Sequence, residues 1–165
     1  RWYGWPDYAG GYPITNPYFK PPDQPQPRFL IAYHPMIPPH PMINFPPYSG
    51  ITGFAINHDP AFGPVGEFYF AEFGPTKRMI GNLPKPAGVG HRITKFNPDT
   101  GMLTPFVFNR NYDALIGTIR LERPIDVLIG PDHAIYILDY GIYNEETSRP
   151  LPYTGSLWKV TRQST

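Results

Sequence analysis

Cysteine is absent from the 165 residues of this chain. Its absence excludes disulfide scaffolds, thiolate zinc sites and cysteine nucleophiles in one step. Charge is also scarce, since charged residues make up 16% of the sequence and the formal net charge is +1. A balance this close to neutral argues against nucleic acid or an anionic membrane surface as a partner, because both require a basic face.

Long apolar runs and helical periodicity are missing as well. Proline or a charged residue interrupts every apolar run before the roughly 18 residues that a membrane span needs. No window keeps an apolar face at i, i+3, i+4 and i+7, so the sequence predicts little helix. The first residues, RWYGWPDYAGG, have neither the basic start nor the apolar core of a signal peptide, and Arg1 indicates an internal cut.

Proline and aromatic residues are abundant instead. The chain has 24 Pro and 16 Gly, but also 3 Trp, 12 Tyr and 11 Phe, which give it enough apolar area to fold. Fifteen of the prolines lie within residues 1–64, so we expect residues 6–47 to be mainly loop. Phe29–His34 is the one strand expected there.

From Gly50 onward, short apolar runs alternate with turn sequences. The runs are rich in β-branched and aromatic residues, and turns such as Asn97–Gly101 separate them. They predict antiparallel strands near residues 51–57, 66–73, 91–96, 103–108, 124–129, 134–140 and 156–161.

An internal repeat relates these strands. Glu67–Gly74 matches Ala134–Gly141, with the final glycines 67 positions apart. A repeated four-strand unit is typical of the blades of a β-propeller. We therefore predict an all-β fold, a partial β-propeller of about two four-stranded antiparallel blades in residues 50–165, preceded by a Pro-rich loop segment in residues 1–49. The second blade lacks its fourth strand.

Seven short motifs stand in order along the chain. They are Tyr3-Gly4-Trp5-Pro6 and residues 66–74, 97–101, 122–127, 130–132, 136–141 and 154–160. In this order and spacing the sequence resembles the C-terminal part of the glucose/sorbosone dehydrogenase family. The resemblance implies a six-bladed propeller that uses pyrroloquinoline quinone (PQQ) with calcium to oxidise a sugar outside the cytoplasm.

The same resemblance implies that some catalytic and metal-binding residues come from other parts of such a protein. The general-base histidine and the calcium ligands come from blades N-terminal to residue 3, so no catalytic residue is assigned in this chain. The expected partners are those remaining blades, on the same or a separate chain, a sugar substrate and an electron-acceptor cytochrome. The expected location is extracytoplasmic: periplasmic, cell-surface or secreted.

Arg123 is the first candidate cofactor-binding residue. The resemblance places an arginine here against a cofactor carboxylate, which a planar guanidinium binds bidentately. A second arginine of some relatives is replaced by Ile125. The alternative is a structural ion pair of Arg123 with Asp126 or Glu122.

Lys77, Arg78, Tyr48 and Ser49 complete the candidate cofactor site. Lys77 and Arg78 form a basic pair suited to an anionic ligand, although such pairs are commonly solvated. Tyr48 replaces a histidine of many relatives, and with Ser49 it offers hydrogen bonds.

The five histidines are not spaced as metal ligands, and no metal site is assigned. We expect His133 to be a turn residue with positive φ.

Two other functions stay open beside the PQQ-dependent dehydrogenase. One is a non-catalytic propeller that binds a glycan or a protein. The other is a structural subunit of an extracellular assembly, which the Pro-rich segment favours.

Overall fold

The computed structural model describes residues 1–84, 86–109 and 120–161. Its regular structure is almost entirely antiparallel β, and the longest helix among the described residues is α1 (Lys77–Ile80). The chain divides into two compact units, Arg1–Phe45 and Pro46–Thr165. The prediction of an all-β chain with little helix is therefore confirmed.

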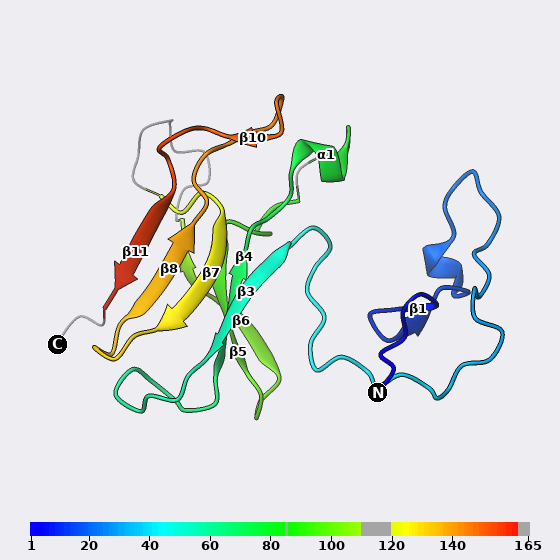
Figure 1. The fold of residues 1–165 in the computed structure, drawn as a ribbon, viewed down its shortest axis with the longest axis horizontal. Helices are drawn as coiled ribbons and strands as arrows, with labels where there is room; N and C mark the ends of the chain where they lie inside the picture. The colour runs from blue at the N-terminus through cyan, green and yellow to red at the C-terminus, as the bar shows by residue number, and fades with distance from the viewer. Residues whose placement is uncertain (85, 110–119, 162–165) are drawn as a thin grey trace. The chain divides into compact units, whose positions relative to one another are not determined.

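The second unit contains two main sheets. One has the order β3-β4-β5-β6 and the other the order β11-β8-β7, and neither is closed (Figure 1). Their strands are β3 (Ile51–Ile56), β4 (Phe68–Glu72), β5 (Arg92–Asn97), β6 (Met102–Phe108), β7 (Pro124–Ile129), β8 (Ile135–Asp139) and β11 (Ser156–Val160). All seven strands expected from Gly50 onward are present, with ends shifted by at most two residues.

The repeat in the sequence corresponds to a repeat in strand pairing. In the first sheet a bulge lies between Ile51 and Gly53 of β3, where it faces the end of β4. In the second sheet the equivalent bulge lies between Pro124 and Asp126 of β7, where it faces the end of β8. Thus β3-β4-β5 and β7-β8-β11 are matching antiparallel units, each with a bulge that bends its first strand at the same register.

The core forms where the two sheets pack, with β7 lying against β3 and β4. Alternation along the strands directs one set of side chains inward, so that Ala71, Ile93, Ile135 and Ile137 are fully buried. The ring of Tyr69 also packs here. The Thr52 hydroxyl donates to the Pro124 carbonyl oxygen at 3.1 Å, which adds a polar contact between the sheets.

A buried carboxylate ends the second strand of each sheet. Glu72 accepts hydrogen bonds from the Gly90 N–H and from Arg92 Nε, both at 3.0 Å, and from the Thr94 hydroxyl. At the matching position of the repeat, Asp139 accepts from the backbone N–H groups of residues 122, 123 and 141. Asp139 thus satisfies three loop N–H groups that the sheet leaves unpaired, and Glu72 satisfies one loop N–H group and two side chains of β5.

Glycines allow the chain to pass close to these carboxylates. Gly74 and Gly141, which match in the repeat, both have φ of 89°. A Cβ at Gly141 would lie 2.4 Å from the Thr154 backbone, and one at Gly90 would lie 2.0 Å from Gly74. Only glycine fits such approaches at positive φ. His133 also has positive φ, 60°, as predicted for a turn residue.

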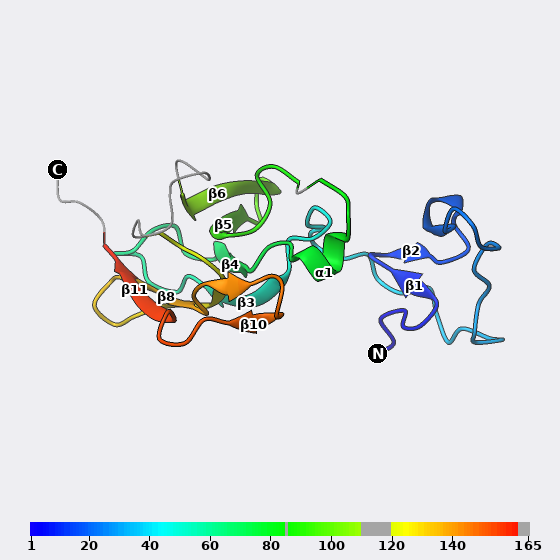
Figure 2. The same cartoon turned by 90° about the horizontal axis from the view of Figure 1, so that it is seen from above.

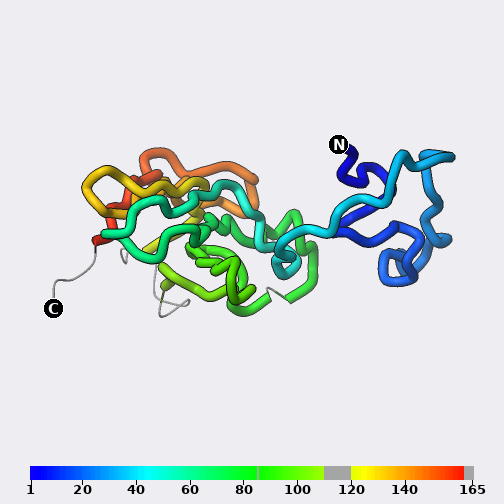
Figure 3. Tube along the Cα trace, turned by 90° about the horizontal axis from the view of Figure 1, so that it is seen from below, coloured from blue at the N-terminus to red at the C-terminus, as the bar shows by residue number. Residues whose placement is uncertain are grey.

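The first unit is held by side chains and turns. Its regular elements are β1 (Tyr8–Ala9), β2 (Tyr12–Pro13) and the 3₁₀ helix Pro17–Phe19. Figure 2 shows β1 and β2 side by side, and Figure 3 follows the path of the chain through this unit. The strand predicted at Phe29–His34 is wrong, because no strand is assigned there.

Asp7 explains why that segment is not a strand. Its buried carboxylate accepts the N–H groups of Leu30 and Ile31, which a neighbouring strand would otherwise use, and contacts the His34 ring at 2.8 Å. Burial raises the pKa of Asp7, but these hydrogen bonds outweigh burial and hold the pKa below its ordinary value of 3.8. The His34 ring in turn stacks on Trp2.

The carboxylate at Asp139 gives a first prediction. Asp139→Asn should lower the free energy of unfolding by about 1.5 to 3 kcal/mol, because the amide NH₂ would face backbone donors that now meet a charged acceptor. Urea unfolding followed by tryptophan fluorescence measures the change. Asp99→Asn makes the same substitution on an exposed turn and should shift stability by less than about 0.5 kcal/mol. Equal urea concentrations at the midpoint of unfolding for the two variants would contradict the stated role of Asp139.

The second prediction concerns the edge of β11, which has no further partner strand among the described residues. An unpaired edge promotes association between chains, and Leu157 there is 65% exposed. Leu157→Lys should shift the protein from concentration-dependent oligomers towards monomer in sedimentation experiments. Leu138→Lys on β8, the central strand of the same sheet, where the side chain is 43% exposed, is the control and should leave association unchanged. A monomeric unmutated chain would show that the edge is already protected.

Candidate functional site

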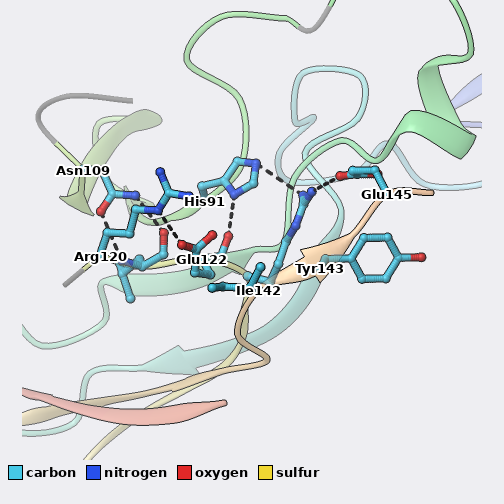
Figure 4. Close-up of a pocket in the computed structure, with 9 residues that line it drawn as sticks. His91, Asn109, Arg120, Glu122, Ile142, Tyr143 and Glu145 are labelled. Atoms are coloured by element: carbon cyan, nitrogen blue, oxygen red, sulfur yellow. Dashed lines mark hydrogen bonds and ion pairs between the residues drawn. The ribbon is translucent and has the colours of Figure 1, made fainter. Parts of the chain in front are cut away.

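A polar pocket of about 220 Å³ lies beside the start of β7. Figure 4 shows His91, Glu122 and Glu145 around it. The lining side chains are two cations, two anions, an imidazole, an amide, a phenol and two aliphatic groups: His91, Asn109, Arg120, Leu121, Glu122, Arg123, Ile142, Tyr143 and Glu145. The site therefore gathers polar groups from four separate stretches of the chain.

Arg123 is the central residue of this pocket. It directly precedes β7, and its own N–H is held by Asp139 at 2.8 Å. The side chain is buried and donates from Nη1 to the carbonyl oxygens of Phe73 and Pro75, at 3.0 and 2.9 Å. Nη2 makes an ion pair with Glu145 at 2.6 Å. The guanidinium thus joins the end of the first sheet to the loop that follows β8.

Aromatic rings cover the faces of the same guanidinium. The carbon Cζ of Arg123 lies 4.9 Å from the centre of the Phe73 ring and 5.7 Å from that of Tyr143. Cation–π attraction of this kind strengthens where water is excluded. The charge is therefore stabilised from its edge by oxygen acceptors and from its faces by rings.

Glu145 links the arginine to the candidate basic pair. One of its oxygens contacts Arg123, and the other accepts the Lys77 backbone N–H at 2.7 Å. Glu145 lies beyond β9 (Tyr143–Asn144), which pairs with β10 (Arg149–Pro150). This small hairpin therefore supplies the carboxylate that contacts Arg123.

His91 contributes a ring with both nitrogens engaged. Its Nε2 lies 3.3 Å from Arg123 Nη1, and its Nδ1 contacts the Glu122 carbonyl oxygen. Because an arginine can only donate, Nε2 is the acceptor, and we assign the ring proton to Nδ1, which donates to the carbonyl. The lone pair that a general base would use is directed at Arg123. In this arrangement His91 orients the arginine and has no lone pair left for a substrate.

The segment of residues 73–75 connects Arg123 with a second predicted residue, Ser49. Ser49 is buried, and its carbonyl oxygen accepts the Gly74 N–H while its hydroxyl donates to Pro46. Tyr48 precedes it at a φ of 69°, in the turn that leads to β3. Neither residue lines the polar pocket.

Lys77 and Arg78 lie on α1, and both side chains are exposed. Only the backbone of Lys77 reaches the site, through its bond to Glu145. The fold therefore brings Arg123 and the Lys77 backbone together but does not direct the side chains of the basic pair into the pocket.

Sequence reasoning missed His91, Arg120 and Glu145. Arg120 pairs with Glu122, while Glu145 takes the role of anionic partner to Arg123. Two signals pointed weakly to them: His91 follows Gly-Val-Gly, and Glu145 lies in the polar insertion that follows the repeat. Neither feature of the sequence indicates which residue His91 or Glu145 contacts.

A second ionic cluster lies in the turns at the far ends of β3 and β7. His133 Nδ1 contacts Asp59 at 2.6 Å, and this hydrogen bond holds the pKa of Asp59 below its ordinary value of 3.8. Bonds from Lys159 and from the Tyr136 hydroxyl lower the pKa of Asp132 to about 2. Both carboxylates are therefore ionised at neutral pH; Asp59 joins two loops, and Asp132 joins its turn to β8 and β11.

Comparison with protein-family models, with curated proteins and with solved structures found no match for this chain. The described part of the chain contains no group of three or more acidic or histidine side chains arranged to hold a metal ion. It also contains no helix of the length and apolarity needed to cross a membrane.

A third prediction follows from the contacts of Arg123. Arg123→Ala should lower the free energy of unfolding by about 3 kcal/mol, because a buried group left without its partner costs about 1 to 3 kcal/mol and two carbonyl oxygens lose theirs. Arg123→Lys should recover only part, since an ammonium lacks the planar fork. Chemical unfolding measures both variants. Arg78→Ala on exposed α1 is the matched control, with a change under about 0.5 kcal/mol. A similar loss in the control would refute the structural role of Arg123.

Proposed function

We propose that residues 46–165 form two neighbouring blades of a β-propeller, and that these blades have a structural and binding role that does not include holding a cofactor. The matching units β3-β4-β5 and β7-β8-β11, with equivalent bulges and equivalent buried carboxylates, support the blade assignment. Blade repeats pack face to face around an axis, as β7 packs on β3 and β4.

The engagement of Arg123 is the observation that carries the non-catalytic role. Its guanidinium is already bonded to two carbonyl oxygens, to His91 and to a carboxylate within the same unit. A PQQ carboxylate would have to displace Glu145 from an ion pair that also fixes the Lys77 backbone. As folded, the residues present do not fit the cofactor, and we derive no chemical step through it.

The open edge of β11 supports a role within a larger propeller. The first sheet has β6 as its fourth strand, whereas the second has no strand at that position among the described residues. We propose that a strand from a further blade, on the same or another chain, pairs there. The extracytoplasmic location belongs to the same proposal.

The PQQ-dependent sugar dehydrogenase is the second candidate. It is favoured by the two arginines, Arg120 and Arg123, that line one pocket, because a guanidinium group can bind an anionic ligand. In that case the sugar substrate, the electron-acceptor cytochrome and the calcium ion would meet residues outside this chain.

A fourth prediction separates the two candidates. PQQ with calcium is titrated calorimetrically into the full-length protein that contains this chain, and into its Arg123→Lys and Arg78→Ala variants. The structural role predicts that Arg123→Lys lowers the melting temperature but leaves any PQQ affinity unchanged. The dehydrogenase predicts a loss in affinity of about tenfold or more for Arg123→Lys, since a bidentate contact would be broken. That loss, with Arg78→Ala unaffected, would overturn the structural proposal.

A further inference from the structure

The loop between β3 and β4 contains the only Asp-Pro pair in the sequence, Asp59-Pro60. A proline nitrogen carries no hydrogen, so it cannot attack the aspartate side chain to form an imide, as the nitrogen after other aspartates can. The opposite reaction stays open, in which the aspartate side chain attacks its own backbone carbonyl carbon. The bond to proline is then the one that breaks.

A buried asparagine fixes the conformation of this loop. The Asn57 side-chain oxygen accepts the Asp59 N–H at 2.9 Å, and its NH₂ group donates to the carbonyl oxygens of Gly63 and Pro64, at 3.0 and 2.9 Å. Asn57 itself is inaccessible to solvent. The backbone on both sides of the Asp59-Pro60 bond is therefore held in one arrangement. Holding reacting groups in place lowers the entropic part of a reaction barrier.

The carbonyl oxygen of Asp59 accepts two backbone hydrogen bonds. They come from the N–H groups of Phe62 and Gly63, at 3.2 and 3.3 Å. A pair of N–H donors on one carbonyl oxygen polarises the carbonyl carbon and stabilises the negative charge that develops on the oxygen during nucleophilic attack. Hydrogen bonds to a charged oxygen are shorter and stronger than those to a neutral one, so both contacts favour the attacked state.

Hydrogen bonds also orient the Asp59 carboxylate. Oδ1 accepts the Ala61 N–H at 2.9 Å, and Oδ2 lies 2.6 Å from His133 Nδ1. Because an ionised carboxylate only accepts, Nδ1 carries a proton. The hydrogen bond from His133 is the main cause that holds the pKa of Asp59 below its ordinary value of 3.8. The carboxylate therefore keeps its ionised, nucleophilic form in mildly acidic solution.

The other charged groups around this contact have partners or face solvent. His58 is exposed on the same loop and lines the same surface pocket as the ion pair. Asp132, which precedes His133, pairs with Lys159 at 2.6 Å and accepts the Tyr136 hydroxyl at 2.8 Å. His133 is therefore the group that sets the charge environment of the carboxylate in this loop.

We propose that the chain cleaves itself at the Asp59-Pro60 bond in mildly acidic solution. A carboxylate oxygen of Asp59 bonds to the Asp59 carbonyl carbon, and the bond from that carbon to the Pro60 nitrogen breaks. The nitrogen keeps the electron pair and takes a proton from the acidic solvent, which leaves a five-membered cyclic anhydride on Asp59 and a free amine on Pro60. Water then opens the anhydride to two carboxyl groups. The net reaction is the hydrolysis of one peptide bond.

His133 is a positioning residue in this reaction, since it orients the carboxylate and keeps it ionised but takes no part in making or breaking bonds. The cut lies in the loop between β3 and β4, so these strands remain paired after cleavage. The two fragments, residues 1–59 and 60–165, therefore stay together until they are denatured. The activity is independent of the proposed blade role, because it needs only one loop and the turn that faces it.

Mass spectrometry of the whole chain under denaturing conditions tests the proposal. The purified chain is incubated at about pH 5, where histidine is ordinarily protonated, both folded and unfolded in concentrated urea. We expect fragments 1–59 and 60–165 to form about tenfold or more faster in the folded chain, because only the fold orients the carboxylate. Equal rates would show acid lability of the dipeptide alone and would overturn the proposal, as would an uncut folded chain.

Asp59→Asn and Pro60→Ala test the mechanism of cleavage. The first removes the nucleophile, and the second replaces the weakened bond by an ordinary peptide bond. Both variants should remain intact under the conditions that cleave the unmutated chain, and circular dichroism checks that they are folded. Fragments of unchanged mass from Asp59→Asn, apart from the substitution itself, would point to a contaminating protease and would overturn the proposal.

His133→Gly tests the positioning role, because glycine keeps the positive φ of 60° at this turn and removes the imidazole. Cleavage should slow by about tenfold. The pH below which the rate falls should also rise towards 3.8, since His133 would no longer lower the pKa of Asp59. His58→Ala on the same loop is the matched control and should leave both the rate and its pH profile unchanged. An unshifted pH profile in His133→Gly, or an equal slowing in His58→Ala, would overturn the role of His133.

Discussion

The fold of the second unit depends on one recurrent interaction, a buried carboxylate at the end of the second strand of each sheet that accepts three hydrogen bonds. Glu72 and Asp139 occupy matching positions, and both are almost inaccessible to solvent. A buried charge is stable only where donors surround it, and each of these carboxylates has three. The donors to Asp139 come from loops, whereas those to Glu72 come from the loop residue Gly90 and from two side chains of β5, so the carboxylates fix both the sheets and the neighbouring loops.

Arg123 is placed by this interaction. Its backbone N–H is one of the donors to Asp139, so this carboxylate fixes the backbone position from which the arginine side chain extends. From there the side chain reaches the carbonyl oxygens of residues 73 and 75, which follow the first carboxylate, and then Glu145. The two sheets are thus joined through a chain of polar contacts in which every link is satisfied. Such a network favours one arrangement of the chain, because any buried polar group left without a hydrogen-bond partner would lower the stability of the fold.

These contacts favour a structural interpretation of Arg123, which the resemblance in the sequence had suggested as a cofactor-binding residue. A guanidinium serves equally well in a cofactor site and in a structural one, since its fork geometry suits any carboxylate. Here the carboxylate is supplied by the chain itself, from the hairpin of β9 and β10. Any binding role of the first unit rests on different chemistry, because its accessible surface is aromatic and nearly neutral.

The sequence by itself determined the strands, the repeat and several turns, because these features depend on neighbours close along the chain. Alternating apolar runs defined β3 to β8 and β11, and the matched glycines at 74 and 141 marked the same turn twice. Only the tertiary structure decided the partners of Arg123, which lie 22 to 50 residues away in the sequence. It also decided that Leu30 and Ile31 bond to Asp7 and do not pair in a sheet. Local propensity cannot anticipate such contacts, because a buried charge finds its partner only after the fold has brought distant loops together.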